Sequence, residues 1–153
     1  MPFLMNIFRI LIVVILLNSA PTLCKEYLEI LPKNGDGLKT IFQRYRLDYT
    51  EHNLSVFNSL NQSKLGSSNS LYLGVKYKLP IHVYQYNSKS IRSTIGNSDY
   101  EYAVTLQDYN DLLFSKGVKG NNYRIDKELW VPEVTFFIKE GENIISNNTV
   151  TST

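Results

Sequence analysis

The sequence contains few of the residues on which metal and disulfide chemistry depend. It has one cysteine and two histidines in 153 residues. A zinc ribbon needs four such ligands and a disulfide scaffold needs several cysteine pairs, so both classes are excluded. The sequence also lacks an excess of positive or negative charge, because 16 Lys and Arg against 14 Asp and Glu leave a net charge of +2. Nucleic acids are bound by densely basic surfaces, so we expect no nucleic-acid partner.

The hydrophobic segment near the N-terminus is too short to cross a membrane. The apolar run Ile10–Leu17 follows Arg9, whereas a membrane-spanning helix needs about 20 apolar residues. A positive charge, a short apolar core and then small residues are typical of an export signal. We therefore expect residues 1–24 to be a signal peptide that is cleaved near Cys24, with a retained N-terminal anchor as the alternative. The expected location is the periplasm or the cell envelope.

Residues 26–81 show the pattern of a strand, two helices and a second strand. Tyr27–Leu31 alternates in part and predicts a strand, and Leu71–Pro80 predicts another that its proline ends. Between them, Leu38–Tyr45 carries apolar residues at helical spacing, and Thr50 is a suitable cap for a second helix. The expected fold class is α+β, with two short helices on a two-stranded antiparallel sheet.

Residues 82–132 have a weaker pattern. Val83–Tyr86 and Ser90–Ile95 predict strands, Tyr102–Leu113 predicts a helix, and Lys127–Pro132 predicts a last strand that proline again ends. Because no Gly-Asp-Thr-like turn precedes the helix, we favour a small strand-helix-strand extension of the first stretch. The alternative is a degenerate second copy of it, since both stretches end in a similar strand.

Four separate segments of the first stretch agree in order and spacing with a known module. They are Gly35-Asp36-Gly37-Leu38, Ile41 with Tyr45, Leu60-Asn61, and Leu71–Pro80. On these residues, the stretch resembles a LysM domain, a small secreted module that binds glycans containing N-acetylglucosamine. The resemblance covers about a third of the chain. Gly37 stands where the family usually has Ser or Thr, so one hydroxyl of the expected sugar site is missing.

The resemblance implies where a glycan binds. In LysM domains the groove lies between the turn after the first strand and the loop before the last strand. The matching residues are Gly35, Asp36, Gly37 and Leu38 on one side and Asn69, Ser70, Leu71 and Tyr72 on the other. The alternative interpretation is that the glycines only shape the turn, that Asp36 caps the helix, and that Leu38 and Leu71 belong to the core. Tyr84 and Tyr86 are the best exposed candidates for stacking on a sugar.

The second stretch carries a looser resemblance. Ser90–Gly96, Gln107–Asn110 and Leu129–Pro132, following a LysM domain, are similar to the N-terminal half of certain bacterial N-acetylmuramoyl-L-alanine amidases. In those proteins a zinc-dependent catalytic domain follows, whereas here 21 residues follow Pro132. This resemblance implies a wall-targeting half of such an enzyme. Residues 133–153 are predicted to be a flexible tail, because the stretch from Glu140 onwards is rich in Asn, Ser and Thr.

The sequence offers no constellation of catalytic residues. His52 and His82 stand apart and are expected to be surface residues without partners, and no second histidine follows either at metal-ligand spacing. Cys24 is lost if the signal is cleaved, and no pair of carboxylates stands out for glycoside cleavage. We therefore predict no catalytic residue, no metal, no cofactor and no enzymatic activity for this chain.

The leading hypothesis is an exported, non-catalytic module that binds peptidoglycan or a chitin-like glycan. A single shallow groove binds weakly, so self-association or a partner chain is expected to raise the avidity. Two alternatives stay open. The chain is either the wall-targeting part of an amidase, or an envelope protein that contacts only other proteins, since a fold does not fix a function.

Overall fold

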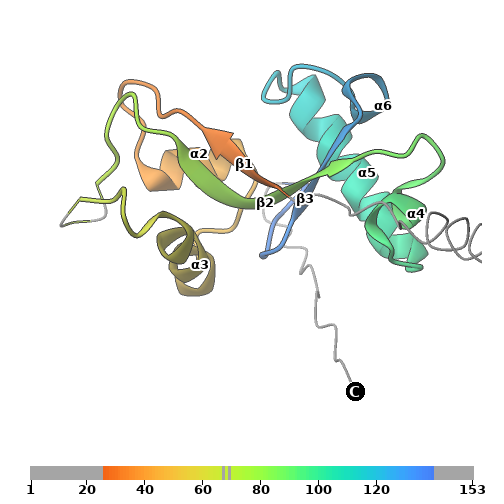
Figure 1. Cartoon of the computed structure of the whole chain (residues 1–153), viewed down its shortest axis with the longest axis horizontal. Helices are drawn as coiled ribbons and strands as arrows, with labels where there is room; N and C mark the ends of the chain where they lie inside the picture. Colours follow the sequence, from red (N-terminus) through yellow and green to blue (C-terminus); the bar gives the residue numbers. More distant parts are fainter. Residues whose placement is uncertain (1–25, 67, 69, 140–153) are drawn as a thin grey trace, which may run out of the picture.

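The computed structural model describes residues 26–66, 68 and 70–139 of this mixed α+β chain. The predicted signal peptide, Asn69 and residues 140–153 lie outside the described residues. Strand β2 runs through the molecule, with α2 and α3 towards one end of it and α4, α5 and α6 towards the other (Figure 1). In chain order, the elements are β1 (Glu26–Ile30), α2 (Leu38–Arg44), α3 (Glu51–Asn61), β2 (Tyr77–Gln85), α4 (Ile91–Ile95), α5 (Tyr100–Ser115), α6 (Tyr123–Asp126) and β3 (Glu128–Pro132).

The sheet has three strands in the order β1-β2-β3, and both neighbouring pairs are antiparallel. The two-stranded sheet predicted from the sequence is therefore wrong. Ile30, the last residue of β1, lies opposite Tyr77, the first of β2. Gln85, the last residue of β2, lies opposite Glu128, the first of β3. The expected boundary between residues 81 and 82 lies inside β2, so the two stretches of the sequence share one sheet.

Strand β2 is displaced from the predicted Leu71–Pro80, because it begins at Tyr77 and passes through Pro80. A proline in a central strand removes one donor from the ladder and is normally found at an irregularity. The pairing with β1 has its register shift between Tyr27 and Glu29, opposite this part of β2. On the other side, the last pair with β3 joins Ile81 to Pro132. Pro80 thus coincides with a break in one ladder and lies just beyond the other.

The two helices of the first stretch form as predicted. Ile41 and Phe42 of α2 are fully buried, and Leu38 packs against the same core. At the start of α3, the side chain of Thr50 accepts a hydrogen bond from the backbone N–H of Asn53 at 3.2 Å. The apolar stripe and the cap are local signals, and both therefore survive unchanged in the folded chain.

The predicted strand Ser90–Ile95 is instead a helix, α4. The hydroxyl of Ser90 accepts the N–H of Ser93 at 3.0 Å and so caps the first turn. Gly96 ends the helix in the left-handed region with φ 67°. A side-chain cap at one end and a glycine at the other are start and stop signals of a helix, and here they outweigh the strand propensity of the isoleucines. The predicted helix Tyr102–Leu113 lies within α5.

Two buried asparagines connect helices to strand edges by the same three hydrogen bonds. In α3, Asn61 donates to the carbonyls of Phe57 and Lys78 and accepts the N–H of Lys78, each at 2.8 Å. In α5, Asn110 donates to the carbonyls of Leu106 and Trp130 and accepts the N–H of Trp130. Each amide therefore satisfies both backbone groups of one strand residue.

The first part of the predicted flexible tail is folded. Phe136 is fully buried, Val134 is nearly so, and the ring of Phe136 contacts that of Tyr109 at 5.0 Å. The carbonyl of Thr135 accepts hydrogen bonds from the N–H of Asp48 at 3.1 Å and from the side chain of Asn53 at 2.8 Å. The prediction of a tail is wrong for residues 133–139, because apolar side chains there complete the core beside the α2–α3 connection.

We expect Asn61→Ala to lower the free energy of unfolding by about 1–3 kcal/mol, because it leaves two backbone groups of Lys78 without their partner in a partly buried position. Urea denaturation followed by circular dichroism measures the change. Gln62→Ala, at an exposed neighbouring position, is the matched control and is expected to change stability by less than about 0.5 kcal/mol. Equal stability of the two variants would contradict this role of Asn61.

Candidate functional site

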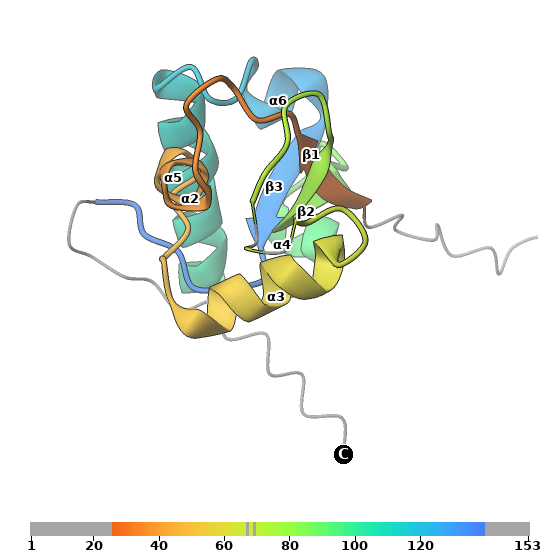
Figure 2. The ribbon, with the colours of Figure 1, turned by 90° about the vertical axis from the view of Figure 1, so that its left-hand side faces the viewer.

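Strand pairing brings the two loops of the predicted glycan site to one end of the sheet. Because Ile30 lies opposite Tyr77, the chain leaving β1 and the chain entering β2 start side by side. These loops comprise residues 31–37 and residues 62–76. Figure 2 shows both on the same side of the sheet's end, with the first loop diverging towards α2. Six of the eight predicted site residues are described residues of these loops. Of the other two, Leu38 is the first residue of α2 and Asn69 lies outside the described residues.

Asp36 organises the first loop as an acceptor. Its carboxylate accepts the backbone N–H of Lys33 at 2.8 Å and pairs with the guanidinium of Arg44, where one of the bonds is 2.9 Å long. The side-chain hydrogen bonds from Arg44 are the main cause that holds the pKa of Asp36 below its usual range. The expectation that Asp36 caps the helix is wrong, because Gly37 is the N-cap of α2 and no side chain caps it.

The two glycines of this loop leave its backbone uncovered. Gly35 has φ +85°, a conformation that residues with a side chain rarely adopt. No atom lies within 4 Å of the position where a Cβ would stand on Gly35 or Gly37. Leu38 is half-buried and packs against the core. The first side of the predicted groove is therefore an exposed turn, which the Asp36–Arg44 pair connects to helix α2.

The hydroxyl of Tyr77 fixes the second loop. It accepts the N–H of Tyr72 at 2.9 Å and donates to the carbonyl of Lys64 at 3.2 Å. Ser70 accepts the N–H of Gly66 through its carbonyl at 3.3 Å, while Leu71 is half-buried against the core. Asn69 lies outside the described residues.

The same loop presents two apolar side chains to solvent. Tyr72 is 53% exposed and Leu73 is 63% exposed. The ring of Tyr72 lies over Gly66, where a Cβ would stand 2.4 Å from the phenol oxygen, so Gly66 is the residue that makes room for the ring. An exposed tyrosine on a supported loop suits contact with the apolar face of a sugar.

The two tyrosines expected on an exposed strand face behave differently. Tyr84 is 7% exposed, so its prediction as an exposed stacking residue is wrong. Tyr86 is half-buried and contacts the ring of Tyr123 edge-on, with centroids 5.0 Å apart. At this end of β2 the side chains alternate, with Val83 half-buried and Gln85 exposed, and the alternation places Tyr84 on the buried face.

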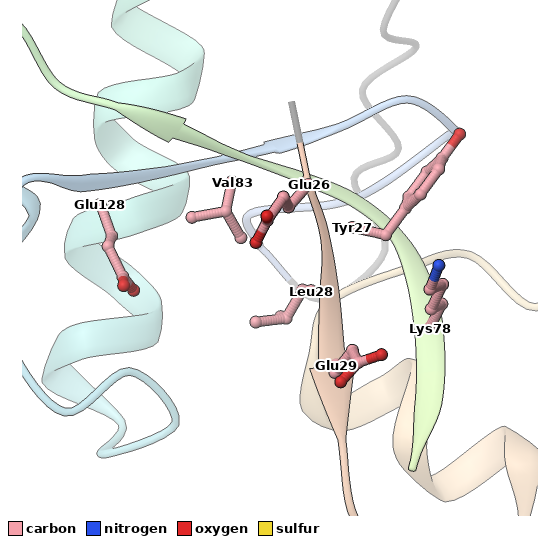
Figure 3. A pocket seen from close by; sticks show the side chains of 7 residues that line it. All are labelled: Glu26, Tyr27, Leu28, Glu29, Lys78, Val83 and Glu128. Atoms are coloured by element: carbon pink, nitrogen blue, oxygen red, sulfur yellow. The ribbon is translucent and has the colours of Figure 1, made fainter. Parts of the chain in front are cut away.

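A hollow of about 560 Å³ lies along β1 and does not include the predicted site residues. Figure 3 shows Glu26, Leu28 and Val83 on the side of β1 that faces Glu128, with Tyr27 and Lys78 on the other side. Three carboxylates and one ammonium group line it, namely Glu26, Glu29, Glu128 and Lys78. A hollow with this charge disfavours anionic ligands.

A second hollow of about 390 Å³ lies between the end of β2 and the helices α4, α5 and α6. Tyrosine rings and cationic side chains from residues 86 to 124 line it. Sequence reasoning missed this hollow because its residues belong to four separate elements. The only related pattern in the sequence is Ser90, a residue type that commonly caps helices. It could have predicted helix α4, which forms one wall of the hollow, in place of the expected strand.

His82 has a partner, contrary to the expectation that both histidines are unpartnered surface residues. It is 8% exposed, and its Nε2 lies 2.7 Å from Oε2 of Glu133. Tyr27 donates its hydroxyl to the same oxygen at 3.1 Å, and burial followed by the charge of Glu133 raises the pKa of Tyr27. The cluster ties β1 and β2 to the chain after β3. His52 is exposed, as predicted.

Metal-binding clusters and membrane-spanning helices are both absent from the described part of the chain. Within residues 26–66, 68 and 70–139, no three His, Cys, Asp or Glu side chains are grouped so that they would hold a metal ion. No helix in that same part combines the length and the apolar character needed to cross a membrane.

We expect Asp36→Asn to lower the free energy of unfolding at pH 7 by about 1–3 kcal/mol, because it removes a charged hydrogen-bonded pair with Arg44. The pKa of Asp36 is lower in the folded chain than its usual 3.8. Its stabilisation is therefore complete above the unfolded-state pKa and is lost as the pH falls through the folded-state value. The difference between wild type and variant should narrow on acidification in urea titrations.

The matched control is Asp108→Asn, which changes an exposed carboxylate on α5. It is expected to change stability by less than about 0.5 kcal/mol at neutral pH. An Asp36→Asn deficit that stays constant from neutral pH into strong acid would contradict the role given to the Arg44 pair.

Comparison with known proteins gives no match. No protein-family model, no curated protein and no solved structure matches this chain.

Proposed function

We propose that this chain is an exported, non-catalytic module that binds peptidoglycan or a chitin-like polymer through N-acetylglucosamine units. The binding site is the pair of loops at the end of the sheet where β1 stops and β2 starts. The observation that carries the proposal is the pairing of Ile30 with Tyr77, which sets the two loops beside each other. The order of β1, α2, α3 and β2 supports the LysM-like interpretation of this part.

The chemistry of the two loops fits a neutral glycan. A sugar with hydroxyl and acetamido groups is bound by backbone donors and acceptors and by small apolar surfaces rather than by charge. The open turn at Gly35 and Gly37 offers uncovered backbone, and Tyr72 and Leu73 offer apolar surface. The one carboxylate of the turn, Asp36, is already paired with Arg44. This carboxylate is therefore already neutralised by a partner and does not require a cationic ligand.

Such a site binds weakly, with a dissociation constant of about micromolar to millimolar, or roughly −8 to −4 kcal/mol. A shallow polar surface keeps much of its water, and the gain for each sugar unit is small. Retention on an insoluble polymer is nevertheless expected, because many equivalent units raise the effective concentration of ligand. A second site, self-association or a partner chain adds further avidity.

We expect Gly37→Tyr to weaken binding of chitotetraose, a neutral tetramer of N-acetylglucosamine, at least about tenfold, which corresponds to about 1.4 kcal/mol. The backbone of Gly37 accepts any residue at φ −102°, and the space above it is open. The new ring is therefore expected to cover the proposed site without disturbing the fold. Binding is measured by calorimetry, and retention by a pull-down on insoluble peptidoglycan.

The matched control is Gln43→Tyr, which places the same ring on an exposed position of α2. This variant is expected to bind like the wild type. Two results would contradict the proposal. One is a folded wild-type chain that neither binds chitotetraose nor is retained on peptidoglycan, and the other is a Gly37→Tyr variant that binds chitotetraose with unchanged affinity. The second result favours the alternative of an envelope protein that contacts only proteins.

The amidase alternative assigns the same binding role to this chain and differs in what is attached to it. The segments behind that resemblance, Ser90–Gly96 and Leu129–Pro132, form α4 with its end and β3. The reading frame beyond Thr153 separates the two. A continuation rich in His and Glu supports a wall-targeting part of an enzyme, and a stop codon supports a module that acts alone.

A further inference from the structure

Residues 77–132 repeat the plan of residues 26–85. The first part has β1, α2, α3 and β2, with β1 and β2 antiparallel. The second has β2, α4, α5 and β3, with β2 and β3 antiparallel, and adds the short helix α6 before its last strand. The two parts share β2, which closes the first and opens the second.

The buried asparagines support this correspondence at atomic level. Asn61 lies at the end of α3 and holds Lys78 of β2 by both backbone groups. Asn110 lies in α5 and holds Trp130 of β3 in the same way. Each also donates to the carbonyl four residues earlier in its own helix. Three matching bonds at matching places are more specific than the order of elements alone.

The correspondence identifies a second pair of loops. Gln85 lies opposite Glu128, as Ile30 lies opposite Tyr77. The chain after β2, residues 86–90, and the chain before β3, residues 116–127, therefore match the two loops of the proposed glycan site. The first pair of loops adjoins the start of β2 and the second pair adjoins its end, so the two pairs lie at opposite ends of the sheet (Figure 1). The hollow of about 390 Å³ is lined by residues of both.

We call this hollow the second groove, and its lining combines aromatic rings with positive charge. The guanidinium carbon of Arg124 lies 4.5 Å from the ring centroid of Tyr123, and that of Arg92 lies 5.9 Å from Tyr100. Arg124 also donates to the side-chain carbonyl of Gln107 at 3.3 Å, so the amide helps to position the guanidinium. Lys89 adds a third cation to the lining.

Of the residues that the structure describes, no carboxylate lines the second groove. The acidic residue of α6, Asp126, is paired with the buried ammonium of Lys119. Among the described residues, no ion pair involves Arg92, Arg124 or Lys89. The cations of the groove therefore remain available to a ligand, and the charge that complements them is negative.

We propose that the second groove binds an acidic sugar. The ring of Tyr100, which is 63% exposed, contacts the apolar face of the sugar, and a guanidinium binds its carboxylate by paired hydrogen bonds. This inference rests on the proposed function, because it assigns a second element of the same wall polymer to the opposite end of the module. A polymer strand in which neutral amino sugars alternate with amino sugars whose carboxylate is free, rather than joined to a peptide, offers both ligands.

The experiment is a titration of the ¹⁵N-labelled chain, followed by its amide NMR signals at pH 7 and constant ionic strength. The probe is N-acetylmuramic acid, which carries a carboxylate on the ring of N-acetylglucosamine. We expect it to shift the amides of residues 86–92, 100, 107 and 123–124. N-Acetylglucosamine alone and lactate alone, which supply the sugar and the carboxylate separately, are expected to bind at this groove at least about tenfold more weakly.

Arg124→Gln is expected to weaken the binding of N-acetylmuramic acid about tenfold. Residue 124 is exposed, so the variant should fold normally. Lys39→Gln removes one exposed charge of α2, outside both loops of the second groove, and is expected to leave the affinity unchanged. Equal binding by both variants would overturn the proposal, as would shifts caused equally by lactate, because lactate binding alone would reveal an unspecific anion site.

A parallel titration with chitotetraose separates this inference from the proposed function. Shifts confined to residues 35–38 and 70–73 with that ligand support the first site regardless of the second. If they occur while N-acetylmuramic acid leaves the second groove unmoved, the inference fails and the proposed function stands. If neither ligand shifts any amide, both fail.

Discussion

Backbone pairing along both edges of β2 is the constraint on which the rest of this structure depends. A buried strand leaves donors and acceptors on two edges, and each must be satisfied. β1 takes one edge over the first part of β2, and β3 takes the other over the last part. Where β3 no longer reaches, the amide of Asn61 supplies the missing partners at Lys78. The position of each loop at the ends of the sheet follows from this pairing.

Local signals in the sequence were sufficient for much of the secondary structure. The stripe that includes Ile41 and Phe42 predicts α2, and Thr50 predicts the start of α3, because both act through residues within one or two turns. The third strand, the passage of β2 through Pro80 and the packing of Phe136 were not predictable in this way. Each depends on a partner far away in the chain, which no window of the sequence contains.

The candidate sites differ in how far the sequence could indicate them. The turn from Gly35 to Leu38 was indicated by a resemblance, and the structure adds what that resemblance lacked, the pairing of Asp36 with Arg44. The role of Asp36 was missed because its partner is one helix away. The second groove carries no motif, since its tyrosines and arginines are scattered over elements that only the sheet brings together. The nearest pattern in the sequence is the helix cap at Ser90. It predicts local backbone structure and gives no information about a ligand.

The segment after β3 has a consequence for how the chain is made. Thr135 and Phe136 complete contacts with residues 46–53 and Tyr109, which leave the ribosome much earlier. Until that late segment emerges, the α2–α3 connection lacks its cover and the core stays open. Packing of this part of the core therefore waits until residues 133–137 have been made, because contacts between distant parts of a chain cannot form before both exist.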